Sequence, residues 1–145
     1  METQVSAWYP VFLNIKDRRC LVIGGGNIGE EKVQKLLDCG AEIVVISPEV
    51  NDRVRELANE GQITWIQRKY QPQDLRGALL AIAATNDNNV NKRIAKEAEE
   101  QKVLLNVVDV THLCTFIAPS VARRGNVTVA TSTGGASPAL ARKFR

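Results

Sequence analysis

The chain has 145 residues, of which 44% are hydrophobic and 24% are charged, as in folded globular proteins and unlike disordered or fibrous ones. Its longest strongly apolar stretch, residues 78–84, is far shorter than the roughly 20 residues that span a bilayer. Residues 1–109 carry 14 basic and 16 acidic side chains, whereas residues 110–145 carry five basic side chains and no acidic one. This basic tail indicates either an anionic partner or simply a soluble surface.

The N-terminus and the cysteines are typical of a cytoplasmic protein. The first residues lack the basic start and apolar run of a secretion signal. The three cysteines, Cys20, Cys39 and Cys114, form no CxxC pair and are odd in number. They predict reduced thiols, with neither a disulfide framework nor a structural zinc site.

The hydrophobic pattern predicts strands and helices in alternation. Residues 20–23 predict a strand that runs into three glycines, and residues 27–38 predict a helix that stops at Gly40. Residues 43–46 are a continuous β-branched run, which is typical of a strand in a parallel sheet covered on both faces. The first part of the chain therefore predicts a βαβ unit.

The same alternation continues to residue 108. Pro48 suits a first helical turn, and the apolar stripe of residues 50–58 predicts a helix that ends at Gly61. Residues 85–88 are cap-forming and predict the start of another helix. Three more strands are predicted, at residues 63–66, 79–84 and 103–108. We expect an α/β fold, a doubly wound parallel sheet of the Rossmann-like kind, with ligands beyond the carboxyl ends of its strands.

The pattern changes after residue 109. Residues 115–122 and 127–131 predict two extended segments joined by a hairpin turn at residues 124–126. Ser137 and Pro138 then suit the cap and first position of a helix, but the chain ends barely two turns later. We expect either a chain that ends early or a helix completed on a partner chain.

Residues 24–29, GGGNIG, satisfy the GxGxxG pattern between a predicted strand and a predicted helix. In that setting Gly24 allows the tight turn, Gly26 lets the backbone approach a pyrophosphate, and Gly29 allows close contact between helix and sheet. The alternative is a purely structural glycine turn. The context favours dinucleotide binding.

Two further segments bear on the cofactor. About 20 positions after the first glycine, where the pattern expects an acidic residue, the chain has Ser47-Pro48-Glu49. Glu49 is therefore slightly late, and Arg53 lies one turn further. The pattern therefore leaves NAD and NADP open, and Arg53 also fits an ordinary surface arginine. Thr85, Asn86 and Asp87 follow the fourth strand, where they contact the cofactor, cap the next helix, or do both.

Asp109 closes the fifth predicted strand at the same rim of the sheet, where a carboxylate could exchange a proton with a substrate; the alternative is a turn aspartate. His112 is the only histidine, and one histidine with one aspartate makes a poor metal site, so no metal ligand is assigned.

Residues 132–138 form a second glycine-rich loop before a helix, which suits an anion site or a plain capped turn.

With these motifs the chain resembles the precorrin-2 dehydrogenase family, the amino-terminal module of siroheme synthases. The resemblance covers about residues 9–145. It rests on five segments in order, which are residues 24–28 with Lys32, residues 83–87 with residues 90–91, residues 106–109, residues 116–120 and residues 132–142.

The family implies oxidation of precorrin-2 to sirohydrochlorin with NAD as the hydride acceptor, and some members then insert ferrous iron. It implies Asp109 as the catalytic aspartate. The expected cofactor contacts are Gly24, Gly26, Asn27, Ile28, Gly29, Ser47, Pro48, Glu49, Thr85 and Asn86. The expected contacts to the polycarboxylate substrate are Ser120, Arg123, Thr133, Gly134, Gly135, Ser137 and Arg142.

The resemblance also implies a division of the chain and a homodimer. Residues 1–118 are expected to form the dinucleotide-binding domain, and residues 119–145 are expected to begin a dimerisation and tetrapyrrole-binding region. A non-catalytic dinucleotide-sensing domain remains the alternative, since it shares the glycine motif and the sheet. No membrane partner is expected, because the longest apolar stretch is too short to span a bilayer. No nucleic-acid partner is expected, because the basic tail lacks interleaved aromatic residues and a recognition helix.

Overall fold

The computed structural model describes residues 8–134, and their contacts divide this part of the chain into two compact units. The first is residues 14–116, and the second combines residues 8–13 with residues 117–134. The helix predicted from Pro138 lies outside the described residues. No helix within the described range has the length and apolar character needed to cross a membrane.

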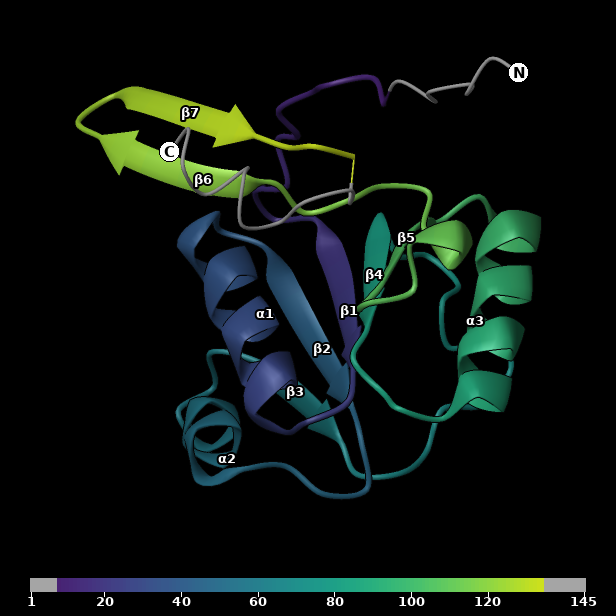
Figure 1. Cartoon of the computed structure of the whole chain (residues 1–145). Helices are drawn as coiled ribbons and strands as arrows, with labels where there is room; N and C mark the ends of the chain where they lie inside the picture. The colour runs from purple at the N-terminus through teal and green to yellow at the C-terminus, as the bar shows by residue number, and fades with distance from the viewer. Residues whose placement is uncertain (1–7, 135–145) are drawn as a thin grey trace, which may run out of the picture. The chain divides into compact units, whose positions relative to one another are not determined.

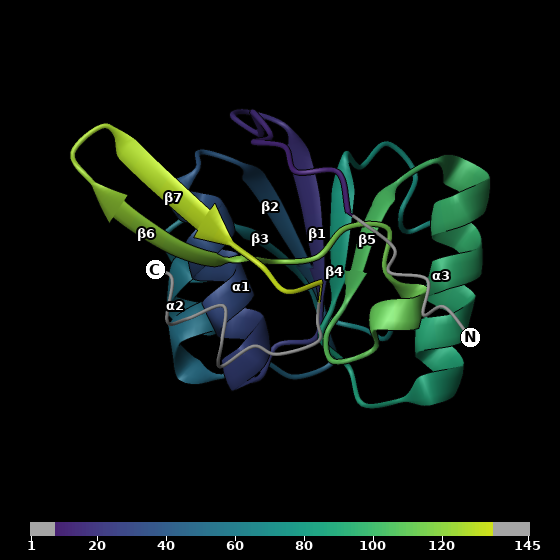
Figure 2. The same cartoon turned by 45° about the horizontal axis from the view of Figure 1, so that its top comes forward.

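The first unit is built on a parallel five-stranded sheet in the order β3-β2-β1-β4-β5, which Figure 2 shows with its strands side by side. Its strands are β1 (Arg19–Ile23), β2 (Glu42–Ile46), β3 (Thr64–Ile66), β4 (Leu80–Ala83) and β5 (Leu104–Val107). The chain starts at the central strand, builds outward to β3, and returns to β4 on the other side of β1. The order reverses between β1 and β4, so the predicted doubly wound, Rossmann-like sheet is confirmed.

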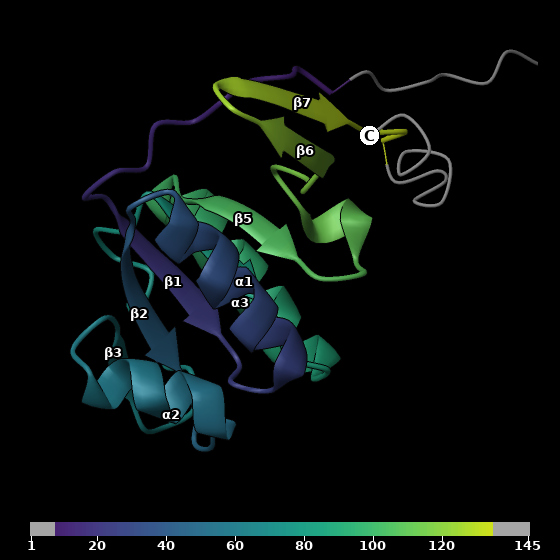
Figure 3. The same ribbon diagram turned by 90° about the vertical axis from the view of Figure 1, so that its left-hand side faces the viewer.

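Helices cover both faces of this sheet. The helices α1 (Asn27–Asp38) and α2 (Asp52–Asn59) lie on one face and α3 (Asn88–Gln101) lies on the other (Figures 1 and 3). In β1, Cys20 and Val22 belong to the core under α1 and α2, whereas Leu21 and Ile23 belong to the core under α3. Because both faces are buried, the strands show no polar alternation.

The second helix begins four residues later than Pro48 suggests. Asn51 is the N-cap of α2, and its side-chain oxygen accepts a hydrogen bond of 3.0 Å from the Val54 N–H. Pro48 therefore belongs to the loop after β2, where Ser47 donates its hydroxyl to the Glu49 carbonyl at 2.6 Å. A proline gives no capping oxygen, whereas asparagine is among the best N-cap residues, so the asparagine sets the start of the helix.

No helix connects β3 to β4. Residues 67–79 cross the α3 face instead and bury Tyr70 and Leu75 there. The buried Glu97 of α3 holds this segment, since it accepts hydrogen bonds from the Tyr70 hydroxyl and, at 3.4 Å, from the Leu75 N–H. These side-chain hydrogen bonds therefore fix the connection between β3 and β4 to the sheet, whereas on the opposite face the packing of α1 and α2 covers the sheet.

The second unit contains the predicted hairpin, but its first strand begins at Ser120, five residues later than predicted, and continues to Arg124, which was predicted to lie in the turn. The strands β6 (Ser120–Arg124) and β7 (Val127–Thr131) pair antiparallel, and Gly125 between them has a φ of +60°. Large apolar side chains of this unit are exposed, among them Tyr9 and Phe12.

Candidate functional site

The glycine-rich turn between β1 and α1 is packed closely by its own backbone. Gly24 has a φ of +117° and donates its N–H to the Ile46 carbonyl at 3.0 Å. A Cβ on Gly24 would lie 2.6 Å from the Ala84 carbonyl oxygen. A Cβ on Gly29 would lie 3.0 Å from the Gly24 carbonyl carbon and closer still to its oxygen. Both positions therefore require glycine for the turn itself.

Gly26 differs, because a Cβ there would meet no atom within 4 Å. It is the N-cap of α1 and has no side chain to cap the helix, whose first N–H groups have no partner within the helix. Open space in front of a helix N-terminus is what an anionic group needs. The space in front of Gly26 and the first turn of α1 is therefore open to an anionic group such as a pyrophosphate.

The loop after β2 is tied to this turn. Asn51 donates its backbone N–H to the Gly25 carbonyl at 2.8 Å and its side-chain amide to Asn27 Oδ1 at 3.2 Å. Ser47 is 8% exposed, so its hydroxyl serves the loop through the Glu49 carbonyl. Pro48 and Glu49 are exposed at the carboxyl end of β2.

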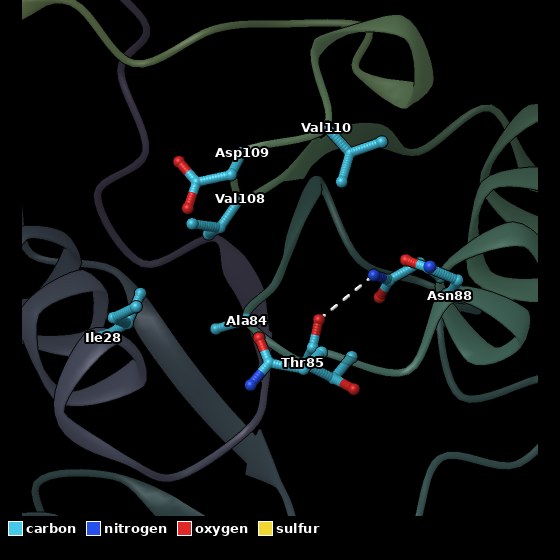
Figure 4. A pocket seen from close by; sticks show the side chains of 9 residues that line it. Ile28, Ala84, Thr85, Asn88, Val108, Asp109 and Val110 are labelled. Atoms are coloured by element: carbon cyan, nitrogen blue, oxygen red, sulfur yellow. Dashed lines mark hydrogen bonds between the residues drawn. The ribbon is translucent and has the colours of Figure 1, made fainter.

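A pocket of about 160 Å³ opens on the other side of β1, beyond the carboxyl ends of β4 and β5 (Figure 4). It brings together four of the predicted residues, Ile28, Thr85, Asn86 and Asp109. Its remaining lining residues are Ala84, Asn88, Asn91, Val108 and Val110. Carboxylate, amide and hydroxyl groups thus lie beside apolar side chains in one small pocket.

Asp109 is held in an uncommon conformation. Its φ is +63°, in the left-handed region that aspartate and asparagine tolerate better than most non-glycine residues. The side chain is exposed, and Figure 4 shows it at the rim of the pocket above Val108. The left-handed residue lies two positions after the end of β5, where the chain leaves the sheet, and it lines the pocket.

Cys114 holds the turn that carries Asp109. Its Sγ accepts a hydrogen bond from the Val107 N–H at 3.1 Å and lies 3.3 Å from the Val107 carbonyl and 3.4 Å from the Val110 carbonyl. Burial raises the pKa of the Cys114 thiol, so the sulfur stays protonated and can donate to these carbonyls. The buried Asn106 donates to the Phe116 carbonyl at 3.2 Å and supports the same turn. The sequence predicted reduced thiols but did not indicate this role of Cys114.

Asn91 is a second residue that the sequence reasoning did not assign. It is 2% exposed, and its amide nitrogen donates to the Thr85 carbonyl at 3.1 Å, the dashed line in Figure 4. Thr85 also accepts the Asp87 N–H through its hydroxyl, and Asp87 caps α3. The helix register was a usable signal, since residues 91, 94 and 98 form one buried stripe.

The predicted substrate-side residues belong to the second unit. Ser120 begins β6 and its hydroxyl is buried, while Arg123 is exposed near the end of that strand. Thr133 is half-buried, and Gly134, with a φ of +69°, donates its N–H to Ser132 Oγ at 3.0 Å. Three further predicted residues, Gly135, Ser137 and Arg142, lie outside the described range.

His112 is exposed in the short 3-10 helix Thr111–Leu113. Within residues 8–134, no three histidine, cysteine or acidic side chains come together as candidate metal ligands.

The parallel sheet, the glycine-rich turn and the pocket beside it define a nicotinamide dinucleotide-binding domain. Residues 11–120 match the protein family described as putative NAD(P)-binding. The chain belongs to this family of NAD(P)-binding domains, and it is similar to siroheme synthases and to SirC precorrin-2 dehydrogenase.

Relatives and a solved structure support this placement. The siroheme synthase of Methylobacillus flagellatus is 43% identical over 136 residues, and that of Nitrosomonas europaea is 45% identical over 139 residues. These matches cover 94% and 95% of this chain but only 29% of each relative. The structure of SirC, precorrin-2 dehydrogenase, superimposes with a TM-score of 0.84 at 34% identity, covering 94% of this chain and 67% of that one.

Proposed function

We propose that this chain binds NAD and carries the active site for the oxidation of precorrin-2 to sirohydrochlorin. The observation that carries the proposal is the position of Asp109, which lines a pocket beyond β4 and β5 together with Ile28 of α1. The similarity to siroheme synthases and to SirC precorrin-2 dehydrogenase supports this substrate.

We propose NAD in preference to NADP. Glu49 is exposed at the carboxyl end of β2, where its carboxylate suits a ribose hydroxyl and repels a 2′-phosphate. Arg53, the candidate for binding a phosphate, pairs with Glu56 at 3.3 Å. The exposed charge at the carboxyl end of β2, where the adenosine ribose would lie, is therefore the negative charge of Glu49.

When bound, NAD supplies the acceptor for a hydride from the substrate. The Asp109 carboxylate accepts the proton that the macrocycle loses in the same two-electron oxidation. Ile28, Val108 and Val110 form the apolar part of the pocket lining beside these groups. The turn held by Cys114 keeps Asp109 at the rim of the pocket.

The second unit is proposed to bind the substrate and a second copy of the chain. Residues 110–145 hold five basic and no acidic side chains, which suits the acetate and propionate groups of a tetrapyrrole. The exposed apolar side chains of Tyr9, Phe12 and Val127 suit a homodimer interface. Ferrous-iron insertion, which the family implies for some members, stays a prediction.

The test is NADH formation with precorrin-2 for the wild type, for Asp109→Asn and for Asp17→Asn. Asp17 is the matched control, because it is also an exposed aspartate with a left-handed φ, +60°, and it does not line the pocket. Loss of a general base lowers kcat by about 10²- to 10⁴-fold. We expect such a loss for Asp109→Asn with NAD affinity unchanged, and near-wild-type turnover for Asp17→Asn. We also expect the wild type to use NAD in preference to NADP.

Equal turnover by Asp109→Asn and the wild type would remove this aspartate from the reaction. A wild-type protein that binds NAD but does not oxidise precorrin-2 would favour a dinucleotide sensor.

A further inference from the structure

Asn91 holds an acceptor oxygen that the protein leaves unused. The residue is 2% exposed, its Oδ1 is buried, and this oxygen has no hydrogen-bond partner among the described residues. The amide nitrogen donates to the Thr85 carbonyl, which fixes which end of the amide is the free acceptor. Buried polar atoms without a partner are rare and costly in folded proteins, so this oxygen needs an explanation.

The position of Asn91 indicates a ligand. It lines the pocket with Thr85 and Asp109, on the β4 side of the point where the strand order reverses. A dinucleotide bound across that point places its pyrophosphate at the glycine turn and its two halves on either side. Glu49, which is proposed above to bind the adenosine ribose, lies on the β2 side. The half of the dinucleotide that reaches Asn91 is therefore the nicotinamide half.

The wall around this oxygen can yield to a ligand. Asn86 and Asn88 also line the pocket, both are exposed, and neither side chain makes a hydrogen bond within residues 8–134. A small rotation of these side chains breaks no hydrogen bond among the described residues. Asn91 itself stays fixed by the Thr85 carbonyl, so its oxygen is oriented before the ligand arrives.

We propose that Asn91 Oδ1 accepts a hydrogen bond from the carboxamide N–H of the nicotinamide ring and so orients that ring in the pocket beside Asp109. The inference rests on the cofactor placement proposed above. A pyrrole N–H of the tetrapyrrole is the other donor that could reach this pocket. Both are neutral N–H groups, and the choice of dinucleotide distinguishes them.

The test compares NAD+ with 3-acetylpyridine adenine dinucleotide, whose acetyl group keeps the carbonyl but has no N–H. A neutral hydrogen bond is worth about a factor of ten in affinity. We expect titration calorimetry to show that the wild type binds NAD+ about tenfold more tightly, and Asn91→Ala to bind both equally. Asn89→Ala is the matched control, because Asn89 is an exposed asparagine of α3 that does not line the pocket, and it should keep the tenfold preference.

The wild type alone provides a second measurement that does not depend on the variant folding. Nicotinic acid adenine dinucleotide places a carboxylate opposite the Asn91 oxygen, so it should bind more weakly than either of the other two dinucleotides. A preference for NAD+ that persists in Asn91→Ala, or a wild type that does not distinguish the three, would overturn the inference. So would an Asn91→Ala variant with an unchanged preference and a raised KM for precorrin-2, which would assign the oxygen to the substrate. A wild type that binds no dinucleotide would also overturn the cofactor placement.

Discussion

Two glycines of the same turn are expected to respond to alanine in opposite ways. At Gly29 a methyl group meets the Gly24 carbonyl, with the carbonyl carbon at 3.0 Å and the oxygen closer. At Gly26 the methyl group meets no protein atom within 4 Å, and the φ of −82° is accessible to alanine. Gly29→Ala should therefore damage the fold, whereas Gly26→Ala should damage only the binding of a group in front of the helix.

The magnitudes follow from these contacts. Forcing a methyl group into a packed backbone costs about 1–3 kcal/mol, and the helix propensity of alanine returns about 0.5–1 kcal/mol at Gly29. We expect Gly29→Ala to lower the free energy of unfolding by about 1–2 kcal/mol. Gly26→Ala should change it by less than about 0.5 kcal/mol. If a pyrophosphate occupies the open space, the same overlap of about 1–3 kcal/mol appears there as a roughly 5- to 150-fold loss of NAD affinity.

Denaturant unfolding and titration calorimetry with NAD+ separate the two effects. The free energy of unfolding is measured without ligand, and the Kd is measured where each variant is folded. Wild-type NAD affinity in Gly26→Ala would refute the close approach of a phosphate to this backbone. Unchanged stability in Gly29→Ala would refute the packing argument for the turn.

Three other side chains give separate predictions. Cys114→Val should lower the free energy of unfolding by about 1–3 kcal/mol, because it leaves the Val107 N–H without an acceptor, and it should lower kcat but not NAD affinity. Cys114→Ser should recover most of the stability and most of the kcat. A fully active Cys114→Val would contradict the positioning role. In denaturant unfolding, Glu97→Ala should lower the free energy of unfolding by about 2–3 kcal/mol, because two buried donors lose their acceptor. Glu99→Ala, on the exposed face of α3, should lower it by less than about 0.5 kcal/mol. Similar values for the two variants would refute the anchoring of residues 67–79 by Glu97. Burial raises the pKa of Asp74, but hydrogen bonds from Arg68, at 2.8 Å to each carboxylate oxygen, and from the Gln71 N–H outweigh burial and hold that pKa below its ordinary value. Its stabilisation is therefore complete above the unfolded pKa of about 3.9 and is lost as the pH falls through the lower folded pKa. The Tm difference between wild type and Asp74→Asn should be largest at neutral pH and shrink near pH 3, and a difference independent of pH would contradict the ionic role.

Most of the parallel sheet was predictable because each strand is buried on both faces. A continuous apolar run such as residues 43–46 needs no knowledge of its neighbours to be assigned as a strand. The start of α2 was not predicted correctly, because Pro48 and Asn51 both suit a helix start and only the contact from the Val54 N–H decides between them. Residues 67–79 have no regular structure to predict, and what holds them is a pair of side chains, Tyr70 and Glu97, that are 27 positions apart.

At the site, the predictable residues are those whose role depends on their own place in the chain. Asp109 follows a buried strand, so its place at the rim follows from the end of that strand. Asn91 and Cys114 matter through partners six or seven residues away, namely the Thr85 carbonyl and the Val107 N–H. No local pattern distinguishes a buried asparagine whose oxygen is satisfied from one whose oxygen is left for a ligand. That distinction appears only when every donor around the atom is known, so the structure, and not the sequence, identifies Asn91 as the residue to mutate.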